Sequence, residues 1–113
     1  MDCIFCKIAN KEINSSFVYE DEDIIVFNDV NPVAPVHLLA IPKKHISSIM
    51  EIDELEDSIS SRILKIISKI AKDMKIDEEG FRIVSNTGAG AGQSVEHLHF
   101  HILGGRKFNW PPG

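Results

Sequence analysis

Apolar residues recur at a helical period through the middle of the chain. Leu55, Ile59, Ile63, Ile66, Ile67, Ile70 and Met74 are three or four residues apart, as on the buried face of an α-helix. Asp53 before this run, with Glu56 three residues later, predicts a capping box at the start of the helix. The pattern therefore predicts one long helix whose role is packing rather than chemistry.

Shorter runs of β-forming residues lie on both sides of this helix. Three acidic residues at 21–23 separate the first two runs and predict a hairpin between them. A short helical turn is expected near the start, over Cys3–Asn10. The predicted strands are Phe17–Glu20, Ile24–Asn28, Val36–Ile41, Phe81–Ser85 and His97–Leu103. This order predicts an α+β fold with a mostly antiparallel sheet, followed by an irregular tail over Gly104–Gly113.

Composition and charge narrow the class of protein. The 113 residues fit one domain, 1–113, and 43% hydrophobic with 26% charged residues is ordinary for a globular protein. The formal net charge of −5, with no Lys/Arg-rich run, argues against a nucleic-acid partner. No apolar run approaches the ~20 residues that cross a bilayer, and no secretory signal is visible, so we expect a cytoplasmic protein without a membrane partner.

The chain has only two cysteines, Cys3 and Cys6, with two residues between them. In a cytosolic protein, such a pair more often binds a metal or does redox chemistry than forms a structural disulfide. One pair supplies half of a tetrahedral zinc site. His45, which follows Pro42-Lys43-Lys44, is a candidate third ligand.

Three of the five histidines alternate along the last predicted strand. Successive strand side chains point to opposite faces, so His97, His99 and His101 should share one face, ~6–7 Å apart. The residues between them, Leu98, Phe100 and Ile102, should face the core. Such a row is typical either of zinc ligands in a hydrolase or of an imidazole that attacks phosphorus.

A glycine-rich loop over Asn86–Ser94 precedes the histidine row. Gly88, Gly90 and Gly92 permit positive φ angles, and their amides are candidates for an anion-binding nest. Gln93 and Ser94 add side-chain donors. Loop and row together favour a small phosphate-bearing ligand; a zinc-dependent hydrolase remains the alternative, and chelation of the metal would discriminate the two.

Residues 97–103 (HLHFHIL) match the His-φ-His-φ-His-φ-φ signature, in which φ is apolar. Further similarity runs through IFCKI at 4–8, IPKKHI at 41–46, GQSV at 92–95 and WPPG at 110–113. The chain resembles the histidine triad (HIT) superfamily, most closely its Hint branch of purine nucleoside phosphoramidate hydrolases. The resemblance implies a HIT-like fold with a five-stranded antiparallel sheet, one long and one short helix, and a dimer.

The resemblance also implies roles for individual residues. His99 would attack the α-phosphorus, His101 would contact a phosphate oxygen, and Ser94 would bind near the leaving group. His37 would support the hydrogen bonds of the triad. The nucleotide-binding set would be Phe5, Ile8, Phe27, Asn28, Asp29, Val30, Asn86, Gly92, Gln93, Ser94, His99 and His101.

Within that set, Asp29 would accept hydrogen bonds from both ribose hydroxyls, although a turn residue is an alternative interpretation. Phe5, Ile8, Phe27 and Val30 would form the walls around the base, or simply belong to the core. An AMP- or GMP-type purine nucleotide is the expected ligand. A dinucleoside polyphosphate hydrolase and a nucleotide-binding module with little turnover are the alternative functions.

The implied cofactor is a structural zinc ion, with none required for catalysis. Its ligands by resemblance would be Cys3, Cys6, His45 and His97. The implied partner is a second copy of the chain, with Trp110 reaching towards the partner's site.

Overall fold

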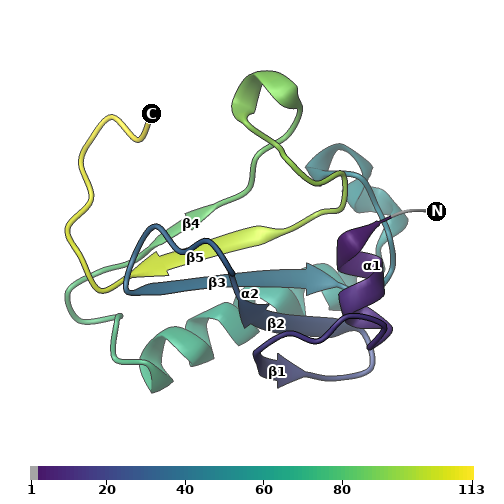
Figure 1. The fold of residues 1–113 in the computed structure, drawn as a ribbon, viewed down its shortest axis with the longest axis horizontal. Helices are drawn as coiled ribbons and strands as arrows, with labels where there is room; N and C mark the ends of the chain where they lie inside the picture. Colours follow the sequence, from purple (N-terminus) through teal and green to yellow (C-terminus); the bar gives the residue numbers. More distant parts are fainter. Residues whose placement is uncertain (1–2) are drawn as a thin grey trace.

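In a computed structural model that describes residues 3–113, the chain forms a five-stranded antiparallel sheet in the order β1-β2-β3-β5-β4 (Figure 1). This confirms the predicted α+β fold. Met1 and Asp2, the first residues of the predicted domain, lie outside the described residues. The elements are α1 (Ile4–Ala9), β1 (Phe17–Glu20), β2 (Ile24–Asn28), β3 (Val36–Pro42), a 3₁₀ helix over Ile49–Glu54, α2 (Asp57–Asp73), β4 (Arg82–Val84), a 3₁₀ helix over Ala89–Ala91, and β5 (Phe100–Gly104).

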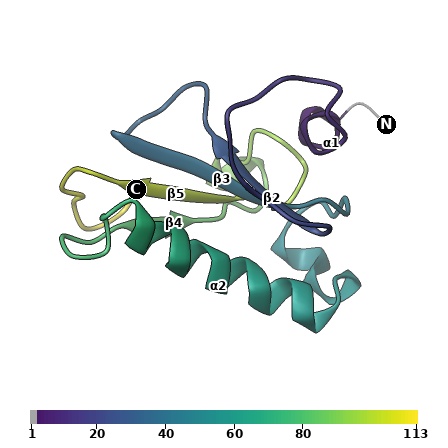
Figure 2. The same cartoon turned by 90° about the horizontal axis from the view of Figure 1, so that it is seen from below.

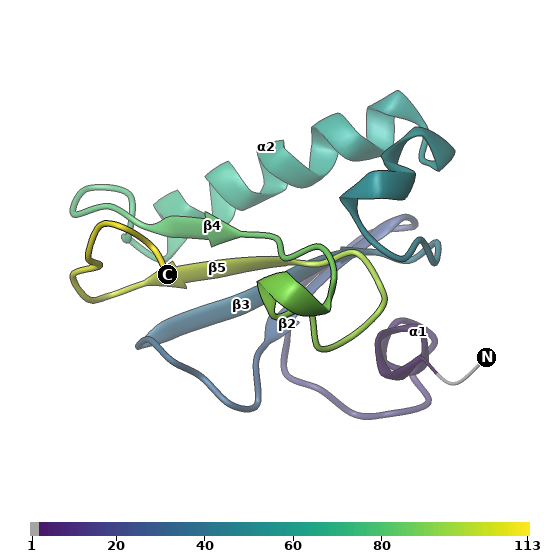
Figure 3. The same cartoon turned by 90° about the horizontal axis from the view of Figure 1, so that it is seen from above.

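The two helices cover opposite faces of the sheet (Figures 2 and 3). Because strand side chains alternate, Ile24, Val26, Leu38 and Ile102 pack on the isoleucine face of α2. Their neighbours on the other face, Ile25, Phe27, Leu39 and Ile41, pack with Phe5 and Ile8 of α1. The face away from α2 is therefore only partly covered by the short α1, which leaves room for a site. None of the described helices is long and apolar enough to cross a membrane.

The start of α2 differs from the prediction. Asp53 lies within the 3₁₀ helix, and α2 begins at Asp57 with Glu56 as its N-cap, which makes no side-chain capping bond. The predicted capping box is therefore wrong. Leu55 is 4% exposed and has extended backbone angles, φ −92° and ψ 145°. The extended backbone at Leu55 therefore separates the two helical segments.

The last strand also starts later than predicted, at Phe100 instead of His97. Its antiparallel partner β3 ends at Pro42, which has no N–H to donate. Ahead of the strand, the Leu98 amide donates to the Ile46 carbonyl at 2.8 Å, outside the sheet. The alternation nevertheless continues through these residues, since Leu98 and Ile102 both pack against α2. Gly104 still belongs to β5, so the irregular tail begins one residue later than predicted.

The predicted hairpin is confirmed and is held by Asp21. Its Oδ1 accepts the amides of Asp23 and Ile24 at 2.8 and 2.9 Å, and its Oδ2 accepts the Tyr19 hydroxyl and the Arg62 Nε. Partial burial opposes ionisation of this carboxyl, but the Arg62 guanidinium and the other donors lower its pKa to about 2. The hairpin is thereby tied to α2.

Replacing Asp21 with asparagine is expected to lower the free energy of unfolding at pH 7 by about 1 kcal/mol, a value reduced for the partial exposure of the ion pair. The ionised form contributes stability above the unfolded pKa of about 3.9, and that stability is lost as pH falls towards 2. Urea unfolding between pH 2 and 7 measures both effects. Glu22→Gln, at an exposed position of the same turn, is the control; identical pH profiles for wild type and Asp21→Asn would contradict the assignment.

Candidate active site and metal cluster

A cavity of about 280 Å³ opens on the sheet face away from α2. This volume is near the lower limit, about 300 Å³, for pockets that hold small molecules. Side chains from α1, β2, the β2–β3 connection and the histidine segment meet there. Nine of the twelve predicted nucleotide-binding residues line it: Phe5, Ile8, Phe27, Asn28, Asp29, Val30, Ser94, His99 and His101.

Several lining residues were missed from the sequence. The connection between α1 and β1 contributes Ile13, Asn14 and Ser15, and the remaining ones are Ile4, Asn31, Leu39 and Val95. Leu39 pairs directly with His101 across the sheet, a register that the alternation of β3 alone does not reveal. The signal for the connection was Ile13, a lone apolar residue in an otherwise polar stretch.

The structure does not bring Asn86, Gly92 and Gln93 to this cavity. The Gln93 side chain braces the loop instead: its Nε2 donates to the Ser47 and Val95 carbonyls, and its Oε1 accepts the Gly88 amide. Asn86 lines a separate open cavity together with Trp110.

Two of the three glycine amides predicted for an anion nest, those of Gly88 and Gly92, are already used within the loop. The amides of Gly88, Ala91, Gly92 and Gln93 all donate to acceptors within the loop, around the 3₁₀ turn. Gly88 and Gly92 have positive φ angles, 85° and 89°, whereas Gly90 does not. The end of the loop, Ser94 and Val95, is the part that reaches the cavity beside His99 and His101.

The backbone fixes the tautomer of His99. Its Nδ1 lies 2.7 Å from the His97 carbonyl oxygen, and a carbonyl only accepts, so Nδ1 carries the proton. The lone pair is then on Nε2, in a ring that lines the cavity and is 4% exposed. Phe5 packs edge-on against this ring at a centroid distance of 5.0 Å. His99 is therefore oriented as a nucleophile or a base.

A second chain of hydrogen bonds orients His101. The Val33 amide donates to His37 Nδ1 at 3.1 Å, so the His37 proton is on Nε2. That nitrogen is 2.9 Å from His101 Nδ1, which therefore accepts and leaves His101 with a proton on Nε2. Burial lowers the pKa of both rings, and Asp29 partly opposes this. While His37 donates to His101 Nδ1, His101 is a neutral hydrogen-bond donor through Nε2 at the cavity.

The four predicted metal ligands converge on one point. The cluster of Cys3, Cys6, His45 and His97 has all its ligand atoms within 4.8 Å of one another. The separations are 3.3 Å for Cys3 Sγ–His97 Nδ1 and Cys6 Sγ–His45 Nδ1, 3.6 Å for Cys6 Sγ–His97 Nδ1, and 3.2 Å for His45 Nδ1–His97 Nδ1. A tetrahedral zinc site requires about 3.6 Å between sulfur and nitrogen and about 3.3 Å between nitrogens. The residues fit zinc.

The protonation states within this cluster also fit a bound metal ion. His97 Nε2 donates to the Pro42 carbonyl at 2.8 Å, so its Nδ1 lone pair faces the two sulfurs. Burial and the neighbouring Cys3 sulfur raise the pKa of the Cys6 thiol to about 11. The Cys6 thiol therefore resists ionising unless a cation lies beside it.

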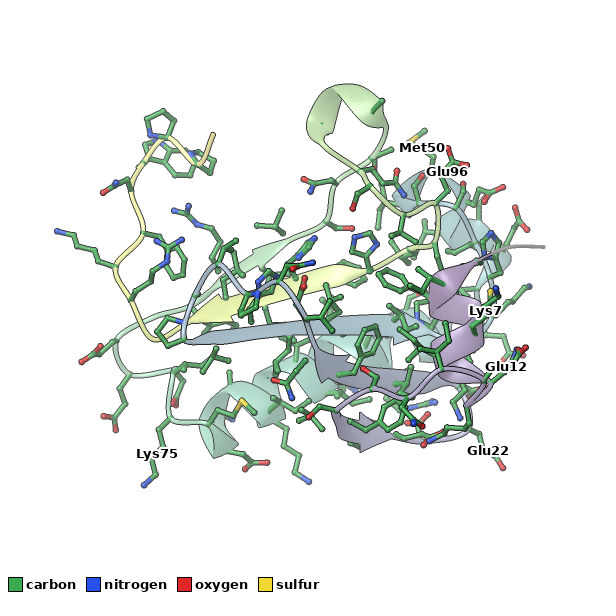
Figure 4. All side chains as sticks on the ribbon, in the orientation of Figure 1. Lys7, Glu12, Glu22, Met50, Lys75 and Glu96 are labelled. Atoms are coloured by element: carbon green, nitrogen blue, oxygen red, sulfur yellow. The ribbon has the colours of Figure 1, made fainter. Side chains whose placement is uncertain are left out.

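The cluster and the cavity are adjacent but distinct. None of the four ligand residues lines the cavity, so a metal held there has no open position towards a substrate. Lysines such as Lys7 and Lys75 extend from the periphery of the molecule (Figure 4), and the cavity lining contains no Lys or Arg. Its polar side chains are two imidazoles, two hydroxyls, three amides and one carboxylate: His99, His101, Ser15, Ser94, Asn14, Asn28, Asn31 and Asp29.

The structure combines a five-stranded antiparallel sheet, two imidazoles at a cavity and a separate Cys₂His₂ cluster. It is therefore an α+β protein with a histidine-lined candidate site. The model of the HIT domain family matches residues 10–108. The chain belongs to this family.

Known proteins are similar to this chain in sequence over nearly its whole length, and solved structures are similar to it in fold. A histidine triad protein from Clostridium difficile has a TM-score of 0.90 and 54% identity, covering 96% of this chain and 95% of its own. A HIT family hydrolase from Legionella pneumophila has a TM-score of 0.91 and 45% identity, covering 99% and 100%. The 14 kDa zinc-binding protein of Brassica juncea is 46% identical over 99% of this chain and 100% of its own.

Proposed function

We propose that the chain hydrolyses purine nucleoside 5′-phosphoramidates through a nucleotide covalently bound to His99. The observation that carries the proposal is the hydrogen bond from His99 Nδ1 to the His97 carbonyl, which leaves the Nε2 lone pair available at the cavity. Membership of the HIT family and similarity to a HIT family hydrolase support hydrolysis. The P–N bond and the purine base come from the resemblance to the Hint branch.

In the proposed reaction, His99 Nε2 attacks the α-phosphorus and the P–N bond breaks, releasing the amine with a proton from solvent or a neighbouring donor. Water then cleaves the P–Nε2 bond and yields the nucleoside monophosphate. The positive charge that develops on the ring is stabilised by the His97 carbonyl through Nδ1–H. His101 Nε2–H and the Ser94 hydroxyl donate to the phosphate oxygens and the leaving group, since no cationic side chain of residues 3–113 lines the cavity.

The nucleoside is proposed to occupy the other end of the cavity. Phe5, Ile8, Phe27 and Val30 form apolar walls for the base, and Val30 is 85% exposed, which a pure core role does not explain. The Asp29 Oδ1 accepts the Asn31 amide at 2.8 Å, so its Oδ2 remains for the ribose hydroxyls.

The Cys₂His₂ cluster is proposed to hold a structural zinc ion. When bound, the ion would join α1, the segment after β3 and the histidine segment. The cysteines are free thiols, as a metal site requires and as a reducing compartment permits, so the cytoplasm is the proposed location.

The active form is proposed to be a homodimer. β4 is an edge strand of only three residues, with Ile83 43% exposed, and Leu64 on α2 is 54% exposed. Trp110, at 83% exposure, lies near this edge and lines the open cavity with Asn86. A second subunit would cover these apolar side chains.

Trapping of the intermediate tests the proposed function. The protein is mixed with an adenosine phosphoramidate, quenched within one turnover and digested for mass spectrometry. We expect an added AMP moiety on the peptide containing His99. Release of AMP without any labelled histidine would instead indicate direct attack by water and would refute the covalent mechanism.

A further inference from the structure

The proton on His37 Nε2 has two acceptors within reach. His101 Nδ1 is 2.9 Å away and Asp29 Oδ2 is 3.3 Å away. The same carboxylate is anchored beside His37, because the Asp29 amide donates to the His37 carbonyl and its Oδ1 accepts the Asn31 amide. His37 is 5% exposed and the Asp29 side chain 17%, so solvent does little to weaken this competition.

These three side chains could also be considered as cation ligands, since their ligand atoms lie within 4.8 Å of one another. The Val33 amide argues against this. It donates to His37 Nδ1, which keeps the proton on Nε2, the nitrogen that would have to bind the metal. At His97 the opposite arrangement holds, because Nε2 carries the proton and donates, which leaves the lone pair on Nδ1. The Asp29–His37–His101 group is therefore built to share a proton.

We propose that Asp29 is a positioning residue that couples recognition of the ribose hydroxyls to the tautomer of His101, through the proton on His37. The inference rests on the proposed function for the identity of the sugar. Without ligand, Asp29 Oδ2 competes for the His37 proton. When ribose hydroxyls donate to Oδ2, the carboxylate becomes a weaker acceptor, and His37 donates fully to His101 Nδ1.

The consequence lies at the phosphate end of the cavity. A firm hydrogen bond at His101 Nδ1 excludes the tautomer with a proton there, so the proton of His101 stays on Nε2. That N–H is the donor available to the phosphate. Correct sugar binding thus completes a catalytic donor, and a substrate without hydroxyls should lose kcat as well as binding.

Tautomers can be observed directly by ¹⁵N NMR of the histidine rings, with no need for turnover. Adding AMP is expected to shift the ¹⁵N signals of His101 to those of the Nε2–H tautomer. Saturating 2′,3′-dideoxy-AMP is expected to leave these signals unshifted. In Asp29→Asn, the Asn31 amide holds the side-chain oxygen and the NH₂ group faces His37, so it cannot accept the proton. This variant should show the Nε2–H form without ligand, whereas Asp77→Asn, the same change at an exposed aspartate that does not line the cavity, should respond as wild type does.

Kinetics with adenosine phosphoramidate and its 2′,3′-dideoxy analogue provide the second readout. Wild type should show kcat lower by about tenfold on the analogue, the effect of one weakened hydrogen bond. Asp29→Asn should show a raised KM but nearly equal kcat for both substrates. A purely structural or binding role would leave the wild-type kcat ratio near one.

The outcomes separate the two proposals. Equal His101 signals with AMP and the dideoxy nucleotide would overturn the coupling, as would equal wild-type kcat values. If the NMR shift is found but no phosphoramidate is hydrolysed, the coupling between sugar and His101 stands and the proposed function fails.

Discussion

Replacing His99 with alanine is expected to lower kcat on adenosine phosphoramidate by at least about 10⁴-fold. The ring is the only group at the cavity whose nitrogen lone pair is set by a backbone carbonyl to face the substrate, among the described residues. Removing it deletes the covalent route, and only attack by water with the remaining donors is left. Nucleotide binding should change by a few-fold at most, because the walls and Asp29 remain.

The measurement combines steady-state kinetics with isothermal titration of AMP. His99→Asn is the matched variant, since its amide nitrogen takes the place of Nδ1 and donates to the His97 carbonyl but cannot attack phosphorus. Both variants should bind AMP and neither should acquire a nucleotide. A normal rate in either, with wild-type thermal unfolding, would exclude His99 as the nucleophile.

The fold was readable from the sequence wherever local periodicity and burial agree. The three- and four-residue spacing of Ile63, Ile67 and Ile70 predicts α2, and the acidic turn predicts the β1–β2 hairpin. The alternation of His97 to Ile102 correctly separates the imidazoles from the core face, even though β5 starts only at Phe100. Leu98 still packs in the core with Ile102, so the alternation of faces continues ahead of the paired strand.

The errors concern contacts between distant segments. Leu55 is buried but extended ahead of α2, and no local signal distinguishes that side chain from the first buried turn of a helix. The glycine loop has the composition of an anion nest, but the Gly88 and Gly92 amides donate within the loop, and Gln93 ties the loop to Ser47, a residue 46 positions away. Composition tells which φ angles are possible and not which acceptors the amides will find.

The candidate site divides in the same way. Its chemistry was visible in the histidine spacing and the Cys-x-x-Cys pair, because few residue types can do this work. The tautomers of the histidines could not be predicted from the sequence, because they depend on the carbonyls of Pro42 and His97 and on the amide of Val33. These backbone groups leave no trace in the residue types.

Removal of the proposed zinc is expected to have the other large effect, on stability. The ligands come from three segments that are far apart in the chain, and an ion bound only in the folded state stabilises it by about 4 kcal/mol at 1,000 times its dissociation constant. Purified protein should contain one zinc per chain, and chelation should lower Tm by about 15 °C.

The matched variants are Cys6→Ser and His37→Gln. Cys6→Ser should lose zinc and its melting should no longer respond to chelator, whereas His37→Gln, a buried histidine outside the cluster, should keep one zinc per chain. The chelated wild type should also lose hydrolytic activity. The ring of His97 is a proposed zinc ligand, and its backbone carbonyl holds His99 Nδ1, so loss of the ion should disturb the position of His99. Substoichiometric zinc in purified wild type, together with an unchanged Tm after chelation, would show that the cluster is held by hydrogen bonds among its thiols and imidazoles and not by a metal.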